Sequence, residues 1–334
     1  MVSVTTPLAR RATRVALFGG GGAGALGAGL YGLLHLEGIM ARRMIGELEN
    51  GAPHADGVYG ASYLGPALSF AVIGDSAGAG LGVDRPDETP GALLAAGLSE
   101  IAERPVRLHT TAYSGAQSQH LAAQVDDALS GEPDVALIII GGNDVTHQVR
   151  PSTSVRYLGD AVRRLQANGC RAVVGTCPDL GTIDPIPQPL RWIARRLSRQ
   201  LAAAQLMTVV EAGARAVTLG SIIGPEFSAA PRDMFAVDRF HPSAAGYSAV
   251  AAAVLPSLAD VLGLWTDADT GAEADGGEAV LPVVVAAERA AEMAGVEVTG
   301  ASVIGRDGGP RGRLARLRRR TRQRDGANAG SVGI

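Results

Sequence analysis

The sequence predicts an α/β fold, a three-layer sandwich with a central, mainly parallel sheet. From residue 68 onward, short apolar runs alternate with longer helical segments, which is the pattern of successive βαβ units. The chain has 334 residues, 46% of them hydrophobic, and is therefore long enough to bury the core of such a sandwich. The expected strands are residues 69–73, 106–110, 135–140, 172–175 and 216–219.

Helices are expected in the segments between these strands. Their ranges are residues 90–102, 118–129, 154–168 and 190–211, and a last helix starts beyond His241 and ends near Leu262. Cys170 and Cys177 flank the strand at 172–175. An extended strand rises ~3.3 Å per residue, so the two cysteines lie about 20 Å apart, too far for a disulfide. Both are expected to be free thiols.

The first 43 residues have the features of a signal peptide or a signal anchor. Arg10, Arg11 and Arg14 precede an uncharged stretch at residues 15–34, and about 20 residues are enough to span a bilayer. No small-x-small cleavage site follows, which favours an uncleaved anchor over a cleaved peptide, with a soluble glycine-rich leader as the alternative. We therefore expect a membrane contact through this segment, with the folded domain anchored or secreted outside the cytoplasmic membrane.

The same stretch contains the spacing G-x-G-x-x-G at Gly19, Gly21 and Gly24. A dinucleotide-binding fingerprint needs a strand before it, then a helix and a second strand. Residues 35–65 contain no second apolar β run, so no dinucleotide site is expected here.

Composition divides the rest of the chain into a linker at 44–66, a folded domain at 67–265 and a tail at 266–334. The tail consists of an acidic, glycine-rich linker, a short apolar stretch and an arginine-rich end. So dense a basic run is typical of a disordered arm, which could contact an anionic lipid or polymer. No nucleic-acid partner is expected, because the formal net charge is −3 and the basic run lacks the aromatic residues that stack on bases.

Small and polar residues follow three successive expected strands. Ser76 follows the strand at 69–73, Gly115 follows the next, and Gly141-Gly142-Asn143-Asp144 follows the third. Open parallel sheets bind their ligands at the carboxyl ends of the strands, so these groups are expected to converge.

The residue types at these positions suit acyl transfer. A backbone N–H at Gly115 and the side-chain amide of Asn143 can stabilise an oxyanion. Ser76 is the candidate nucleophile, His241 the general base, and Asp238, three residues earlier, the carboxylate that orients it. The remaining histidines have no such partner in the sequence and no metal-ligand spacing; they are His35, His54, His109, His120 and His147.

These motifs together resemble the SGNH/GDSL hydrolase family, whose four motif blocks supply a Ser, a Gly, an Asn and a His in this order. The resemblance covers roughly residues 69–262, and it departs from the name-giving motif at Ala77, where that motif has Leu. It implies a flavodoxin-like sandwich and an oxyanion site formed by Ser76, Gly115 and Asn143. It implies no metal and no organic cofactor.

A different serine hydrolase fold is an alternative, because Gly74-Asp75-Ser76-Ala77-Gly78 also satisfies G-x-S-x-G. The nucleophile elbow of α/β-hydrolases comes after several strands, whereas Ser76 follows the first expected strand. Asp238 and His241 also lie within one turn, while that fold takes them from separate loops. The elbow interpretation is therefore disfavoured.

The sequence thus predicts a serine esterase or lipase-like enzyme that cleaves acyl esters through an acyl-enzyme on Ser76. Its expected substrate is a small-molecule, lipid or carbohydrate ester. Acyl transfer to an alcohol and carbohydrate O-deacetylation could use the same site. An inactive membrane-anchored binding protein is the alternative from another functional class.

Overall fold

The computed structural model describes Leu33, Leu36, Glu37, Met40 and residues 51–264. Apart from those four residues, the expected leader or anchor at 1–43 lies outside the described residues, and so does the tail at 266–334.

The described residues form a six-stranded sheet in the order β1-β3-β2-β4-β5-β6. Only the edge strand β1 is antiparallel to its neighbour, and all the other pairs are parallel. The five parallel strands follow the flavodoxin-like order, which confirms the predicted fold class. The strands are Gly57–Tyr59 (β1), Leu68–Gly74 (β2), Val106–Thr110 (β3), Val135–Ile139 (β4), Arg171–Gly175 (β5) and Arg215–Val217 (β6).

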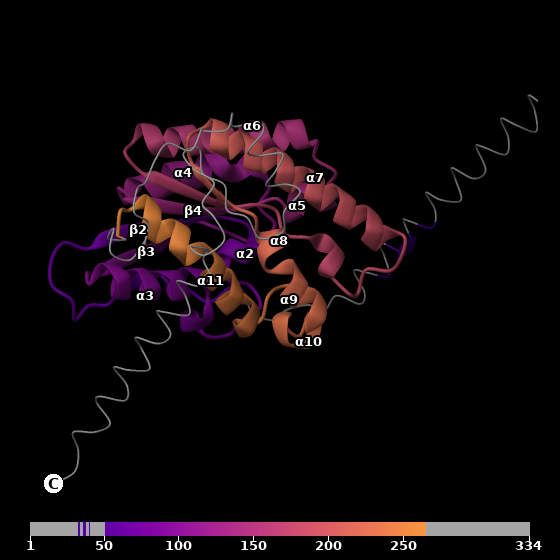
Figure 1. Ribbon diagram of the computed structural model, residues 1–334, viewed down its shortest axis with the longest axis horizontal. Coiled ribbons are helices and arrows are strands. Elements are labelled where there is room, and N and C mark those ends of the chain that lie inside the picture. The colour runs from indigo at the N-terminus through magenta and orange to yellow at the C-terminus, as the bar shows by residue number, and fades with distance from the viewer. Residues whose placement is uncertain (1–32, 34–35, 38–39, 41–50, 265–334) are drawn as a thin grey trace, which may run out of the picture.

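Helices cover both faces of this sheet (Figure 1). One face carries α3 (Pro90–Ala102) and α11 (Ala244–Val261), which pack against each other. The other face carries α4 (Leu121–Ser130), α6 (Pro151–Ala167) and α7 (Leu190–Glu211). The helix ranges at 90–102 and 190–211 coincide with those that the sequence predicts.

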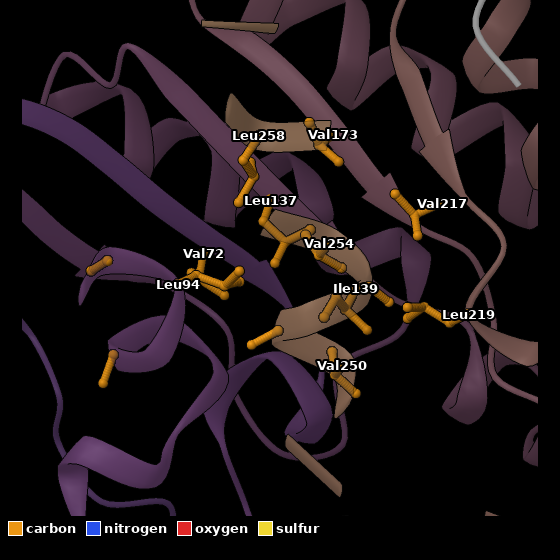
Figure 2. Close-up of a cluster of buried hydrophobic side chains, with 14 of the residues drawn as sticks. Val72, Leu94, Leu137, Ile139, Val173, Val217, Leu219, Val250, Val254 and Leu258 are labelled. Atoms are coloured by element: carbon orange, nitrogen blue, oxygen red, sulfur yellow. The ribbon is translucent and has the colours of Figure 1, made fainter. Parts of the chain in front are cut away.

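Alternate residues of β2, β4, β5 and β6 enter two separate hydrophobic cores, because successive side chains in a strand point to opposite faces. On β4, Leu137 and Ile139 pack with Val254 of α11 (Figure 2). Ile138, between them on the strand, packs with Leu158 of α6 and the other helices of the opposite face. Among the described residues, α11 is also the one helix long and apolar enough to cross a membrane, but it is a core helix of this domain.

Two parts of the fold differ from the expectation. The segment at 44–66, expected to be a linker, contributes β1, whose three residues are too few and too exposed to give an alternating pattern. The strand expected at 216–219 ends at Val217, and a run of short helices follows. These helices are α8 (Leu219–Ile222), α9 (Gly224–Ala229) and α10 (Pro231–Met234), each less than two turns long. The thiols of Cys170 and Cys177 are free, as predicted, and the structure shows that both are buried.

Candidate active site

Ser76 begins the short helix α2 (Ser76–Ala79), directly after the central strand β2. The turn between them requires glycine at position 74, where φ is +139° and a Cβ atom would lie 1.9 Å from the carbonyl oxygen of Ile139. The Asp75 N–H donates to that carbonyl at 3.0 Å, and the Asp75 carboxylate caps α2 by accepting from the Ala77 N–H. The turn therefore fixes Ser76 at the carboxyl edge of the sheet.

His241 lies between Ser76 and Asp238. Its Nε2 is 3.0 Å from the Ser76 Oγ, and its Nδ1 is 2.6 Å from Oδ2 of Asp238. The other carboxylate oxygen of Asp238 accepts from the backbone N–H groups of Phe240 and His241. Arg239, with φ of +60°, makes the tight turn that allows these contacts. The structure therefore brings together the three residues that the sequence proposes as a triad.

Two buried carboxylates, Asp238 of this triad and Asp75 beside it, have pKa values shifted in opposite directions. Burial alone would raise the pKa of Asp238, but its hydrogen bonds from the His241 ring and from two backbone N–H groups outweigh burial and leave the pKa below its usual value. Burial raises the pKa of Asp75 to about 6, despite its bonds from backbone N–H groups. Asp238 is therefore held as an anion. An anionic carboxylate is the acceptor that a hydrogen bond from the His241 Nδ1–H requires.

Asn143 lies in α5 (Gly142–Thr146), after β4, and lines the same cleft as Ser76. Its Nδ2 donates one hydrogen bond to the Ala116 carbonyl at 3.0 Å, so its second N–H remains for a ligand. Gly115 does not line the cleft, but it adjoins Ala116 and has φ of +82°. Among the described residues, no acceptor bonds the Gly115 N–H. Two of the three expected oxyanion donors, Asn143 and Gly115, are thus linked through Ala116, which follows Gly115 in the chain and accepts from the Asn143 amide.

Asp144 joins the loop after β3 to the loop after β4. It is fully buried and accepts from the Ser118 N–H at 3.3 and 3.2 Å. The Ser118 Oγ in turn lies 2.7 Å from the Oγ of Ser154 in α6. Burial raises the pKa of Asp144. This carboxylate therefore sets the position of the Gly115 loop relative to Asn143.

An apolar cleft opens beside Ser76 and His241. It encloses about 870 Å³ of empty space, its open mouth included. Its walls come from the turn after β5 and from the short helices α8 and α9. They include Leu180, Ile183, Leu219, Ile223 and Phe227. The Ser76 hydroxyl, the His241 ring and an apolar cavity therefore meet at the carboxyl edge of the sheet.

Comparison with known proteins identifies the family. The GDSL-like Lipase/Acylhydrolase family matches residues 72–249. The GDSL-like esterase Rv1075c of Mycobacterium tuberculosis (strain ATCC 25618 / H37Rv) is 39% identical over 268 residues, which cover 76% of this chain and 85% of that protein. This chain belongs to the GDSL-like lipase/acylhydrolase family. Members of this GDSL family are hydrolases that act on esters.

Solved structures similar to this GDSL-family chain are more distant. An acetylxylan esterase from Geobacillus stearothermophilus, Axe2, is 22% identical with a TM-score of 0.44, covering 59% of this chain and 96% of that one. The psychrotrophic esterase EstA from Pseudoalteromonas sp. is 19% identical with a TM-score of 0.47, covering 58% of this chain and 98% of that one.

Sequence reasoning missed two buried glutamines that hold the strand ends of this GDSL domain. Gln124 of α4 bonds both polar backbone groups of Gly74. Gln205 of α7 accepts from the Cys177 N–H at 2.7 Å and donates to the Ile140 carbonyl at 2.9 Å. Each glutamine lies on the buried stripe of its helix, for example beside Leu121, Val125 and Ala128 in α4. A polar residue on an apolar stripe is the signal that could have found them.

The sequence also assigned no acidic partner to the histidines outside the motifs. His109 of β3 does have acidic neighbours, with Nδ1 3.4 Å from Asp56 and Nε2 3.8 Å from Asp127. No serine hydroxyl of the described residues bonds its ring, so it does not form a second triad. Among the same residues, no group of three or more His, Cys, Asp and Glu side chains is arranged to hold a metal ion.

Proposed function

We propose that this protein hydrolyses carboxylic esters through an acyl-enzyme on Ser76. The observation that carries the proposal is the 3.0 Å contact between the Ser76 Oγ and the His241 Nε2, at the mouth of an apolar cleft. With the Nδ1–H of His241 donated to Asp238, Nε2 has the lone pair that a base needs.

In the first half of the reaction, the Ser76 Oγ attacks the acyl carbonyl carbon and its proton passes to the His241 Nε2. The carbonyl oxygen becomes an oxyanion, which the Asn143 amide and the backbone N–H groups of Ser76 and Gly115 stabilise. The tetrahedral intermediate then expels the alcohol, which takes the proton from Nε2, and the acyl group stays on Oγ.

In the second half, water attacks the acyl carbon and gives its proton to the His241 Nε2. The intermediate collapses, the acid leaves, and the Ser76 Oγ recovers the proton. Asp238 stays ionised throughout and stabilises the imidazolium that forms in each half. These reaction steps therefore need no metal and no organic cofactor.

The apolar walls of the cleft favour an aliphatic acyl chain as the group that occupies it. Leu180, Ile183, Leu219, Ile223 and Phe227 offer carbon surface, and burying a methylene group contributes about 0.8 kcal/mol. An acetyl group, as in carbohydrate O-deacetylation, would use little of this surface. We therefore place an acyl ester with a longer chain ahead of an acetylated sugar.

The test combines active-site labelling with turnover. Purified full-length protein is treated with a fluorophosphonate, and the modified peptide is located by mass spectrometry. Turnover of p-nitrophenyl esters from acetate to decanoate is measured in parallel. We expect a single adduct on Ser76 and kcat/KM values that rise with chain length over the first members. A folded protein that neither forms this adduct nor turns over any ester would refute the proposal.

A further inference from the structure

The first half of α7 presents an aromatic and basic stripe to solvent. The Trp192 side chain is 57% exposed, and the guanidinium of Arg196, one turn later, lies 5.9 Å from the centroid of its ring. Arg199 continues the exposed face. Exposure of an indole is costly in water, and the pairing of indole with arginine is typical of surfaces that meet a membrane interface.

Positive charge exceeds negative charge along this part of α7. Arg191, Arg195, Arg196 and Arg199 lie within nine residues. Asp184 pairs with Arg191, while the buried Asp179 serves both Arg195 and Arg199. Among the described residues, Arg196 has no carboxylate within ion-pair distance. The surface therefore has an excess of arginine that suits an anionic partner.

A second apolar group is attached to the start of this helix. Leu33, Leu36 and Met40 are helical and exposed by 44%, 54% and 45%, and their spacing puts them on one helical face. Glu37, between them, is buried and accepts from the Leu190 N–H at 2.8 Å. In the sequence, the uncharged stretch at 15–34 leads directly into this group.

We propose that these residues, Leu33, Leu36, Met40, Trp192 and Arg196, form a docking surface for a bilayer that contains anionic lipid. The apolar side chains and the indole would enter the interface region, and the arginines would meet the lipid phosphates. The partner is a membrane and not a protein groove, because the exposed group combines scattered apolar side chains with arginine and continues an uncharged stretch long enough to span a bilayer.

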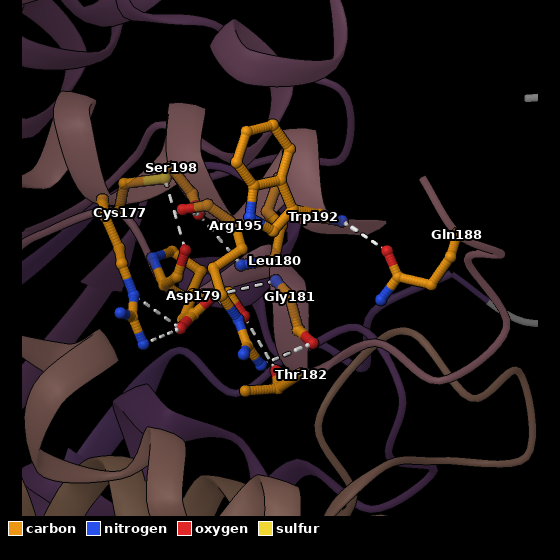
Figure 3. A network of polar contacts seen from close by, with 11 residues as sticks. Cys177, Asp179, Leu180, Gly181, Thr182, Gln188, Trp192, Arg195 and Ser198 are labelled. Atoms are coloured by element: carbon orange, nitrogen blue, oxygen red, sulfur yellow. Dashed lines mark hydrogen bonds and ion pairs between the residues drawn. The ribbon is translucent and has the colours of Figure 1, made fainter. Parts of the chain in front are cut away.

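The docking surface is connected to the cleft. Arg195 donates to the Gly181 carbonyl at 3.0 Å, and the Leu180 N–H donates to the Ser198 Oγ at 3.2 Å (Figure 3). Leu180 and Thr182 of the same turn line the cleft. Docking of α7 would thus place one wall of the cleft beside the lipid.

The experiment uses the full chain with Trp265→Phe, which leaves Trp192 as its one tryptophan. Fluorescence of Trp192 is measured with vesicles of brominated phosphatidylcholine and with vesicles that also contain brominated phosphatidylglycerol, which quench an indole in contact with lipid. We expect strong quenching with the anionic vesicles and weak quenching with the neutral ones. Arg196→Gln should lower the ratio of docked to undocked protein about fivefold, because one basic residue near a surface contributes on this scale.

Two matched controls define the surface. Arg107→Gln removes the same charge from an exposed position on β3 and should leave quenching unchanged. The second control is Leu64→Trp, in a chain that also carries Trp192→Phe and Trp265→Phe. Position 64 is 90% exposed and lies near the β1 edge, and the fluorescence of a tryptophan there should not be quenched. Any one of four results would overturn the proposal. The first two are that Trp192 is not quenched at all, or that it is quenched equally in neutral and anionic vesicles. The others are that the two arginine changes have equal effects, or that a tryptophan at position 64 is quenched as strongly as Trp192.

Discussion

Gln124 bonds both polar backbone groups of Gly74, two residues before Ser76. The glutamine Nε2 donates to the Gly74 carbonyl and its Oε1 accepts from the Gly74 N–H, each at 2.9 Å. The contact joins α4, on one face of the sheet, to the turn that carries the candidate nucleophile. One buried side chain therefore sets where the strand ends.

Gln124→Leu should destabilise the fold and slow ester turnover. The change leaves the buried Gly74 N–H without its side-chain acceptor, which costs ~1–3 kcal/mol. Urea unfolding measures this loss. Gln119→Leu, the same change at an exposed position just before α4, should shift the free energy of unfolding by less than about 0.5 kcal/mol. Equal effects of the two changes would contradict the role given to Gln124.

Ser76→Ala and His241→Ala should each lower kcat for p-nitrophenyl esters by ~10³-fold or more, since the nucleophile and the base act as one unit. Both variants should keep the unfolding transition of the parent protein. His54→Ala removes an exposed histidine and should leave kcat unchanged. Wild-type turnover by Ser76→Ala would end the proposed mechanism.

Asn143→Ala should lower kcat by roughly 10²–10³ with little change in KM, because its free amide N–H is needed mainly when the oxyanion forms. The comparison variant is Asn168→Ala, at an exposed position that ends α6, where neither constant should move. An increase in KM at constant kcat would assign Asn143 to ground-state binding.

Asp75 should make stability depend on pH in the opposite sense from Asp238. The pKa of Asp75 is raised from 3.8 to about 6 by burial, so the folded state binds more protons than the unfolded state between these values, and stability falls as pH rises through them. The lowered pKa of Asp238 has the reverse sign: its contribution is present above the unfolded pKa and is lost as pH falls.

Urea unfolding between about pH 3 and pH 7 tests this contrast, because the Asp238 change lies below the unfolded pKa and the Asp75 change above it. The stability of Asp75→Asn relative to the parent should increase as pH rises, while that of Asp238→Asn should decrease. If both differences move in the same direction, the environment assigned to one of the carboxylates is wrong.

Ile223→Trp should shorten the acyl chains that the cleft accepts. Ile223 is buried at the cleft wall. The indole ring of the replacement is larger than the isoleucine side chain and would fill the space that the far end of a long acyl chain needs. We expect kcat/KM for the octanoate ester to fall about 10-fold or more relative to the acetate ester. Val58→Trp, at an exposed position of β1, should leave the ratio of the two esters unchanged.

The sequence predicted the parts of the protein whose signal is local. Buried strands such as 135–139 are continuous apolar runs, and Asp238 and His241 are close in the chain, so their proximity follows from one turn. The edge strand β1 was missed because it is three exposed residues. Helices α8 to α10 are too short for a periodic pattern. The partners of Gln124, Gln205 and Asp144 were hidden because each lies 26 or more residues away in the chain, and only the fold brings them together.

The short helices after β6 also bear on how such a protein can evolve. Ser76 and Asn143 follow the central strands β2 and β4, whereas Leu219, Ile223 and Phe227 belong to a separate segment that packs over the sheet edge. Mutations in that segment can reshape the cavity while the strand ends stay in place. Proteins that evolve on this scaffold can therefore change which esters they accept by single substitutions, without first losing the ability to cleave esters.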